Sequence, residues 1–154
     1  MKIGIFIDGI TLFHGLDGKR FHFGEFKDWI IKDDSDGYSG YFNCVENAGT
    51  KKKFFIHVRK SGYQVFIRKP KYDFIERKLD VRDMNIELTT EAMYHINEYD
   101  KFILVSGKHN FLPLCEKLEN VGKEIEIIGF KNNINKVFNK YSLRYVEDFL
   151  ETTS

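Results

Sequence analysis

The sequence predicts an α/β fold, a three-layer α/β/α domain with a central, mostly parallel sheet of about five strands. Short apolar runs rich in β-branched and aromatic residues alternate along the chain with stretches whose apolar residues have helical spacing. Two of these runs, Lys2–Asp8 and Phe102–Ser106, are apolar on both faces. That pattern is typical of central strands in a parallel sheet, which helices cover on both sides.

Length and composition exclude several classes of protein. The chain has 154 residues, so we expect residues 1–154 to form one domain. Its 42% hydrophobic and 16% aromatic content argues against a disordered chain. No apolar run reaches about 18 residues, and the N-terminal one is broken at Asp8. We therefore expect neither a membrane span nor a signal peptide.

The two cysteines, Cys44 and Cys115, lie in unrelated segments and form no metal-binding motif. We expect both to be reduced thiols in the core, since lone cysteines are commonly buried. Reduced thiols fit a cytoplasmic location.

Five segments have the length and the β-branched or aromatic content of strands. They are Lys2–Asp8, Tyr38–Val45, Tyr63–Lys69, Phe102–Ser106 and Glu124–Phe130. Two loops are expected, Leu16–Gly24 and Lys32–Gly40. The second contains DDSDGYSG, which we interpret as a turn because it lacks the ligand spacing of a calcium loop.

Three segments have helical spacing of apolar residues. They are Thr50–Ser61, Asn85–Asn97 and Phe111–Val121. Gly62 and Gly122 are placed to end the first and the third. Asn110 is the expected N-cap of the third helix, with Pro113 in its first turn.

Basic residues are concentrated in one part of the chain. Between Lys51 and Leu79 there are ten Lys or Arg and two Asp or Glu, a balance of +8, against −7 for the remainder. Such a segment attracts phosphate backbones, although a solvated helix face is the simpler explanation for its first part. Seven side chains are expected to form one positive surface: Lys51, Lys52, Arg59, Lys60, Arg68, Lys69 and Lys71. Tyr63, Tyr72 and Phe74 lie among them and are candidates for stacking on bases.

The ends of two strands define the expected site. In an open parallel sheet, ligands bind beyond the carboxyl ends of the strands, where the strand order reverses. Asp8 ends the first strand, and Lys108 follows Ser106 at the end of the fourth. An unpaired buried carboxylate is costly, so we expect Asp8 to bind a metal, a cation or a hydrogen-bond donor.

Four stretches suggest a family. In chain order they are IDG near the N-terminus, GYQVFIRKP, MNIELTTEAM and FILVSGKHNFLPLCEKLENVGKEIEIIGF. Together they resemble the NYN domain of the PIN-like ribonuclease group, over nearly the whole chain from Lys2 to Phe149. The resemblance implies a PIN-like fold, a role in RNA processing and acidic residues that hold Mg²⁺ or Mn²⁺.

The resemblance also implies that most of the metal site has been replaced. The family has Asn where this chain has Thr11, and Asp at the positions that align with Asn85 and Glu91. Its SG-Asp-x-Asp-F motif reads SGKHNF here, so Lys108 and Asn110 occupy the places of two aspartates. The catalytic candidates that follow are Asp8, Glu91, Asn85 and His109, with Asp8 and Glu91 as ligands if a metal binds.

Electrostatics predicts what these replacements do. A hard divalent cation is held by several oxygens, usually including one or two carboxylates and substrate phosphate. An ammonium about 4 Å from a metal adds several kcal/mol of repulsion at an effective dielectric near 20. We therefore expect no resident cofactor. In its place we expect Asp8 to contact Lys108, or to accept hydrogen bonds from the N–H groups of the turn or from His109.

Two routes would restore catalysis. A shift in register would bring Asp80, Asp83 or Glu87 into the crevice, although capping the following helix is the simpler role for these carboxylates. Alternatively, His109 would act as a metal-independent base. Its acid partner would be His14 or His95, which are candidates by residue type only.

These observations lead to three hypotheses. The first is a PIN-like NYN domain that associates with RNA and has weak or no nuclease activity, with Lys108 among its RNA-binding residues. The second is an active endoribonuclease that uses Asp8, rearranged acidic residues and Mg²⁺ or Mn²⁺. The third is a protein–protein interaction module on a nuclease-like frame.

Overall fold

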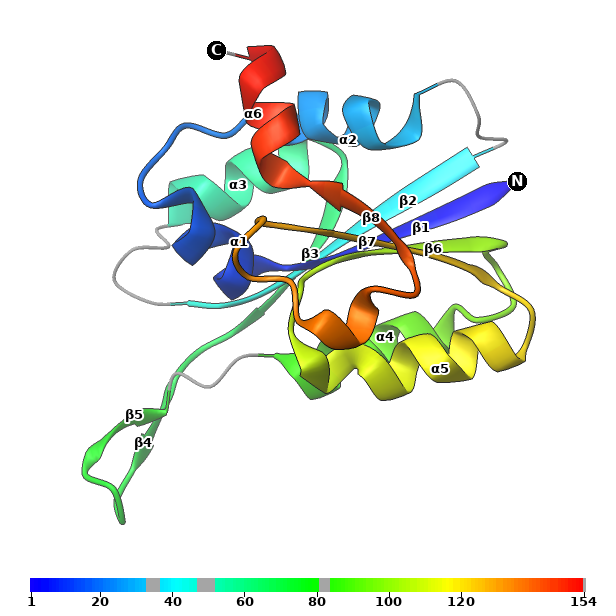
Figure 1. The fold of residues 1–154 in the computed structure, drawn as a ribbon. Helices are drawn as coiled ribbons and strands as arrows, with labels where there is room; N and C mark the ends of the chain where they lie inside the picture. Colours follow the sequence, from blue (N-terminus) through cyan, green and yellow to red (C-terminus); the bar gives the residue numbers. More distant parts are fainter. Residues whose placement is uncertain (33–36, 47–51, 81–83, 154) are drawn as a thin grey trace.

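A six-stranded parallel sheet forms the centre of the molecule (Figure 1). The computed structural model describes residues 1–32, 37–46, 52–80 and 84–153, without the side chains of Lys71, Leu79 and Asp80. The strands are ordered β3 (Tyr63–Arg68), β2 (Gly37–Val45), β1 (Lys2–Asp8), β6 (Lys101–Val105), β7 (Glu124–Gly129) and β8 (Ser142–Tyr145). Every neighbouring pair is parallel. The five predicted strands all belong to this sheet, and β8 adds a sixth.

Helices cover both faces of the sheet and complete three layers (Figure 1). One face is covered by α1 (Gly9–Leu16), α2 (Phe23–Ile31), α3 (Lys52–Lys60) and α6 (Val146–Thr153). The other is covered by α4 (Asn85–Tyr94) and α5 (Leu112–Asn120). Two apolar cores result, and the two-sided burial of β1 and β6 explains their continuous apolar sequence. Within the described ranges, no helix is long and apolar enough to cross a membrane.

The strand order reverses between β1 and β6. From β1 the chain adds β2 and then β3 on one side, returns to β6 beside β1, and adds β7 and β8 on the other side. Ile7 pairs with Val105 in this register, so Asp8 and Ser106 follow at the ends of adjacent strands. The predicted parallel pairing of these two strands is confirmed.

Two predicted loops are shorter than expected. α1 begins at Gly9 and α2 at Phe23, so only a short connection remains of the loop Leu16–Gly24. The buried residues of α2 have helical spacing, at Phe23, Phe26 and Ile30. In the loop predicted over Lys32–Gly40, β2 already begins at Gly37, and residues 33–36 lie outside the described residues.

The helix ends agree in part with the predictions. Gly62 and Gly122 both have positive φ, at +96° and +82°, and end α3 and α5 as expected. Asn110 is not an N-cap, because a 3₁₀ turn, η1 (His109–Phe111), precedes α5 and places Phe111 at the cap position. Pro113 lies in the first turn of α5, where its missing N–H leaves no bond unmade. A second 3₁₀ turn, η2 (Lys136–Phe138), precedes β8.

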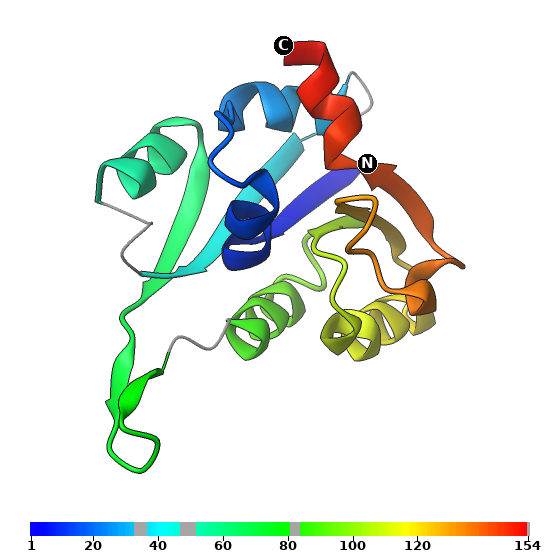
Figure 2. The same cartoon turned by 60° about the vertical axis from the view of Figure 1, so that its left-hand side comes forward.

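A β-hairpin projects from the body of the molecule (Figures 1 and 2). Its strands β4 (Lys71–Asp73) and β5 (Lys78–Asp80) pair antiparallel with each other and lie outside the six-stranded sheet. Asp73 Oδ1 accepts hydrogen bonds from the backbone N–H groups of Ile75 and Glu76, at 2.9 and 3.0 Å, which stabilises the turn. The hairpin follows the carboxyl end of β3, and the sequence analysis did not predict it.

Candidate functional site

Asp8 lies at the reversal of the strand order and is 3% exposed. Two hydroxyl groups donate to its carboxylate, Thr11 Oγ1 to Oδ2 and Ser106 Oγ to Oδ2 at 3.0 Å. Asp8 is also the N-cap of α1, since its Oδ1 accepts from the Thr11 backbone N–H at 3.5 Å. The carboxylate thus accepts a hydrogen bond from a backbone N–H at the start of α1 and from two hydroxyl groups just beyond the carboxyl ends of β1 and β6.

Lys108 provides the cation that was expected beside Asp8. Its Nζ lies 3.8 Å from Asp8 Oδ2, and its side chain is 30% exposed. The backbone N–H of Lys108 donates to Ser106 Oγ at 3.3 Å, so the turn after β6 is tied to the same hydroxyl that contacts Asp8. The predicted contact between Asp8 and Lys108 is present, at the distance of an ion pair rather than a hydrogen bond.

Two asparagines add unsatisfied polar atoms to this part of the fold. Asn43 pairs with Asp8 in the register of β1 and β2 and is 2% exposed. Its Nδ2 and Asn85 Oδ1 are buried without a hydrogen-bond partner among the described residues. Buried polar atoms of this kind are costly unless water or a ligand meets them. Sequence reasoning missed Asn43, although a polar residue in the buried run GYFNCV, opposite Asp8, was the available signal.

Glu91, a metal ligand implied by the resemblance, contacts a histidine of its own segment. Its Oε1 lies 3.0 Å from His95 Nε2, one helical turn later on α4, and His95 Nδ1 lies 2.7 Å from Glu98. The Tyr41 ring packs against this histidine at 4.9 Å between centroids. His95 therefore links two carboxylates within the α4 region, and no contact among the described residues joins it or Glu91 to Asp8.

The residues present do not fit the divalent cation that the resemblance implies. Among the described residues, no three His, Cys, Asp or Glu side chains form a group that would hold a metal ion. Glu87, a candidate replacement ligand, lies 3.9 Å from Arg68. Asp83 and the side chain of Asp80 lie outside the described residues. One carboxylate with an ammonium beside it attracts a dication weakly.

His109 is exposed in η1, directly after Lys108. Its side chain makes no hydrogen bond or ion pair with other described residues, and His14 is likewise exposed, on α1. The described part of the chain therefore does not show the base and acid pair that metal-independent cleavage requires.

The two thiols are core residues, as expected. Cys44 and Cys115 are both free and buried. Burial, and then the charge of Asp8, raise the pKa of the Cys44 thiol to about 12. Burial and the charge of Glu116 raise the pKa of Cys115 to about 12. Both sulfurs are protonated at neutral pH, so neither is poised as a nucleophile or a metal ligand.

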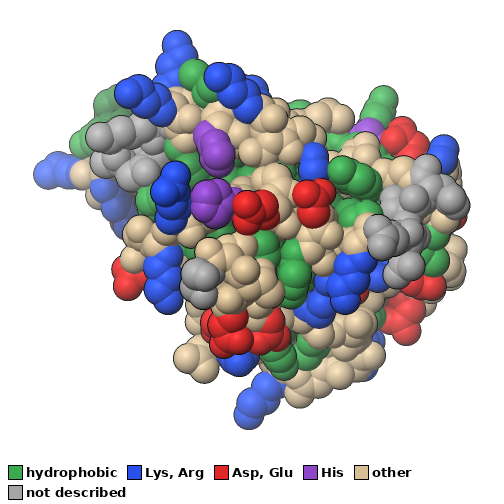
Figure 3. Space-filling view, turned by 90° about the horizontal axis from the view of Figure 1, so that it is seen from above, with side chains coloured by type: hydrophobic (Ala, Val, Ile, Leu, Met, Phe, Trp, Pro, Cys, Tyr) green, Lys and Arg blue, Asp and Glu red, His purple; other side chains and the backbone are tan. Residues whose placement is uncertain are grey.

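The predicted basic surface lies on both sides of the edge strand β3. Lys52, Arg59 and Lys60 are exposed on α3, which packs on the face of the sheet shared with α1 and α2. Arg68 ends β3 and pairs with Glu87 of α4, on the opposite face, and Lys69 is exposed. Lys51 and the side chain of Lys71 lie outside the described residues. Seen from above, Lys and Arg side chains gather on the side of α1 and α3 (Figure 3).

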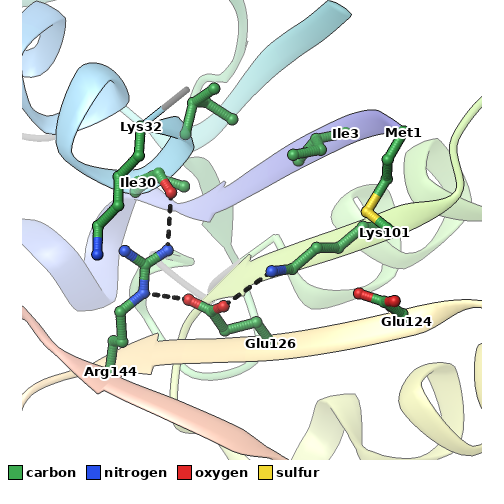
Figure 4. A pocket seen from close by; sticks show the side chains of 9 residues that line it. Met1, Ile3, Ile30, Lys32, Lys101, Glu124, Glu126 and Arg144 are labelled. Atoms are coloured by element: carbon green, nitrogen blue, oxygen red, sulfur yellow. Dashed lines mark hydrogen bonds and ion pairs between the residues drawn. The ribbon is translucent and has the colours of Figure 1, made fainter. Parts of the chain in front are cut away.

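A second charged cluster lies at the opposite edge of the sheet and was not predicted (Figure 4). It lines a pocket of about 480 Å³. Glu126, 5% exposed, receives Lys101 Nζ at 3.1 Å and the Nε–H of Arg144. Arg144 also donates to the carbonyl oxygens of Trp29 and Ile30, at 3.2 and 2.9 Å. Its guanidinium group stacks over the Trp29 ring at 4.8 Å, so this cluster holds α2 to β8.

Comparison with known proteins supports the fold and the family. Residues 2–150 match the NYN domain family. A crystal structure of a protein of unknown function from Vibrio parahaemolyticus is similar, with a TM-score of 0.78 and 18% identity over 96% of this chain and 93% of that one. A short-chain dehydrogenase/reductase variant from Serratia marcescens overlaps 85% of this chain and 56% of that one, at 12% identity and a TM-score of 0.40. None of the curated proteins searched matches.

Proposed function

The chain belongs to the NYN domain family, a PIN-like nuclease family, and on that premise we propose that it binds RNA and cleaves it weakly or not at all. Family membership and the three-layer parallel fold support an RNA-associated, nuclease-like role. Weak or absent cleavage is inferred from the residues around Asp8. We propose further that residues 1–154 act as one domain in the cytoplasm, where the two buried thiols stay reduced.

The single observation that carries this proposal is the distance of 3.8 Å between Lys108 Nζ and Asp8 Oδ2. Two-metal cleavage of a phosphodiester needs several carboxylates around the scissile phosphate. Here an ammonium shares the site with one buried carboxylate. It repels a cation by several kcal/mol at about 4 Å and an effective dielectric near 20. The positive charge of Lys108 thus replaces part of the positive charge that a metal ion would supply beside Asp8.

The same arrangement suits a phosphate group of RNA. Lys108 is 30% exposed and carries the charge, and the exposed His109 follows it in the same turn. Ammonium groups are common phosphate donors in nucleic-acid complexes. The basic surface predicted from the sequence would extend this contact along the strand: Lys51, Lys52, Arg59, Lys60, Arg68, Lys69 and Lys71.

The alternative is an active endoribonuclease that binds Mg²⁺ or Mn²⁺ through Asp8 and rearranged acidic residues. Asn85 Oδ1 is a buried oxygen without a partner among the described residues, and it is the observation that favours this alternative. Asp80 and Asp83 are the candidate further ligands, through parts of the chain that the structure does not describe.

Titration with Mn²⁺ separates these two functions. Calorimetry of the whole chain with Mn²⁺, run beside binding and cleavage of a labelled single-stranded RNA, gives both readouts. We expect RNA binding that weakens steeply with salt, little heat from Mn²⁺ and no metal-dependent products. Tight Mn²⁺ binding and cleavage that Asp8→Asn abolishes would establish the nuclease instead. Absence of RNA binding at low salt would favour the third hypothesis, a protein–protein interaction module.

Charge reversal tests the basic surface. Lys52→Glu, Arg59→Glu and Lys60→Glu together should weaken binding of single-stranded RNA and reduce the slope of log affinity against log salt by about 2. The matched control carries the same reversals on the other side of the molecule, at Lys117, Lys123 and Lys136. Equal losses in both triple variants would show that net charge, and not this surface, determines affinity.

A further inference from the structure

Exposed apolar side chains are concentrated in one stretch of the chain, residues 67–94. Of the eleven large hydrophobic side chains that are exposed among the described residues, six lie there. They are Ile67, Tyr72, Phe74, Ile75, Ile86 and Tyr94. The four most exposed of all belong to this set, with Ile75 at 92%, Phe74 at 83%, Tyr94 at 79% and Ile86 at 78%. Scattered exposed apolar residues are ordinary, but a concentration of this kind marks an interaction surface.

Ile67 lies in β3, and the other five side chains come from two elements, the β4–β5 hairpin and helix α4. The hairpin extends away from the body beside α4 in both views (Figures 1 and 2). Its Tyr72 and Phe74 rings contact each other edge to face at 4.9 Å, yet remain largely exposed. A hairpin of two short strands has little stability alone. Burial of its apolar tip against another surface would stabilise it.

The two elements have opposite charge. Residues 68–78 contain five Lys or Arg and two Asp or Glu, a balance of +3. Residues 84–100, which include α4, contain four Asp or Glu and no Lys or Arg. Within one chain the two already attract each other at their closest point, where Arg68 Nε lies 3.9 Å from Glu87 Oε1.

We propose that this surface binds a second copy of the chain, with the hairpin of each copy packed on α4 of the other. Each chain carries both halves of such an interface, a basic apolar hairpin and an acidic helix with exposed Ile86 and Tyr94. A two-fold axis would pair them twice and close the assembly as a dimer. Aromatic and aliphatic residues would form its centre and the opposite charges its rim.

Charge also argues against RNA as the occupant of the apolar hairpin tip and the exposed side of α4, as distinct from the lysines and arginine at the base of the hairpin. The aromatic residues of the hairpin would stack on bases, but the strand would then run beside the carboxylates of α4. Glu87 on α4 and Glu98, which follows the end of that helix, are exposed, with side chains 44% and 55% accessible, and would repel phosphates. A second copy satisfies both the apolar and the charged parts. This inference does not depend on RNA binding or on the state of the site at Asp8.

The test is the molar mass of the whole chain across a concentration series, by sedimentation or light scattering. We expect a dimer, and Phe74→Ser with Ile75→Ser should weaken it by about a hundredfold or more, since central apolar residues dominate such interfaces. Ile86→Ser with Tyr94→Ser should have a similar effect from the other half. Val121→Ser with Val137→Ser, which removes exposed apolar residues elsewhere, is the matched control and should leave the dimer intact. Far-UV circular dichroism confirms that each variant is folded.

Exchange of charges between the hairpin and α4 tests whether these two elements face each other in the dimer. Arg77→Glu with Lys78→Glu should weaken the dimer, and adding Glu87→Lys should restore part of it, because opposite charges would face each other again. A wild-type chain that stays monomeric at about 100 µM, far above the Kd of specific dimers, overturns the proposal. So does a dimer that the hairpin variant leaves intact. If the chain is monomeric and Phe74→Ser weakens RNA binding, the surface belongs to RNA.

Discussion

Two buried carboxylates lie on different strands of the same sheet, Asp8 at the carboxyl end of the central strand β1 and Glu126 within β7, and they are held in different ways. Glu126 on β7 is in direct contact with two cations, and one of them is itself bonded to two carbonyl oxygens. Asp8 is bonded to two hydroxyl groups, and its nearest described cation is the ammonium at 3.8 Å. Their exposed fractions, 3% and 5%, are almost the same.

We expect the difference to separate a structural site from a binding site. The Glu126 cluster ties β6, β7, β8 and α2 together, and removal of Glu126 leaves two partly buried cations without their shared carboxylate. At Asp8 the lysine makes no direct hydrogen bond to the carboxylate, so a ligand can displace it at lower cost. Asp8 lies at the reversal of strand order, where α/β sheets bind ligands, and Glu126 does not.

The largest effect on stability is expected at Glu126. Glu126→Ala leaves Lys101 and Arg144 without their shared carboxylate and should lower the free energy of unfolding by about 3 kcal/mol. Urea denaturation measures this loss. Glu124→Ala, in the same strand and lining the same pocket but exposed, is the control and should change stability by less than about 0.5 kcal/mol. Equal losses of stability in Glu126→Ala and Glu124→Ala would show that the contacts of Glu126 have no special structural role.

The next effect is on metal affinity at the other site. Lys108→Asp, Asn110→Asp and Asn85→Asp together remove the ammonium and add three carboxylates, so Mn²⁺ affinity should rise at least about tenfold. Calorimetry gives the binding constant. Lys117→Asp, Asn120→Asp and Asn97→Asp change the net charge equally on exposed positions elsewhere and form the control. If the control gains as much affinity for Mn²⁺, the gain comes from the change in net charge and not from new ligands near Asp8.

Asp8→Asn should cost less than the loss of Glu126. Asparagine has one carbonyl oxygen, which still caps α1 if it takes the place of Oδ1, and its Nδ2 then donates to the Thr11 and Ser106 hydroxyl groups after they turn to accept. We expect a decrease of about 1 kcal/mol in the free energy of unfolding, because the partly exposed Lys108 can turn to solvent. A loss as large as that of Glu126→Ala would show that both carboxylates are structural.

The smallest change concerns pH and the neighbour of Asp8. The pKa of Cys44 is raised from 9.0 to about 12, so the thiol stabilises the fold fully below pH 9, and this contribution is lost as pH rises from 9 toward 12. Since the charge of Asp8 is one cause of the shift, Asp8→Asn should make this loss end at a slightly lower pH, and so make its total slightly smaller. Cys115→Ala in both backgrounds is the control, because other charges act on that thiol. Urea midpoints at pH 9, 10, 11 and 12 test this.

The sequence predicted the sheet better than its helices. Two-sided apolar runs such as Lys2–Asp8 are typical of central strands, and the adjacency of this run to Phe102–Ser106 was expected from these runs together with the family resemblance. α1 was missed because it begins directly after a strand and is only eight residues long. β8 was missed because its residues Ser142–Tyr145 have a strand signal too short to distinguish from a loop.

The candidate site was predicted in part. The contact between Asp8 and Lys108 followed from strand adjacency and the cost of a buried charge. Glu91 was placed by resemblance, whereas its spacing of four from His95 on a helix already indicated the local pair that the structure contains. Asn43 was missed because its register with Asp8 depends on how β2 aligns, which alternation alone does not determine.

The double role of Asp8 has an evolutionary consequence. A carboxylate that begins α1 is retained by selection for folding, whether or not it still serves chemistry. A lineage can therefore lose its catalytic partners one at a time while this aspartate persists. Among relatives, an aspartate at this position would say little about activity. The residue that replaces Lys108, three positions before Phe111, would be the informative character for separating active enzymes from pseudoenzymes.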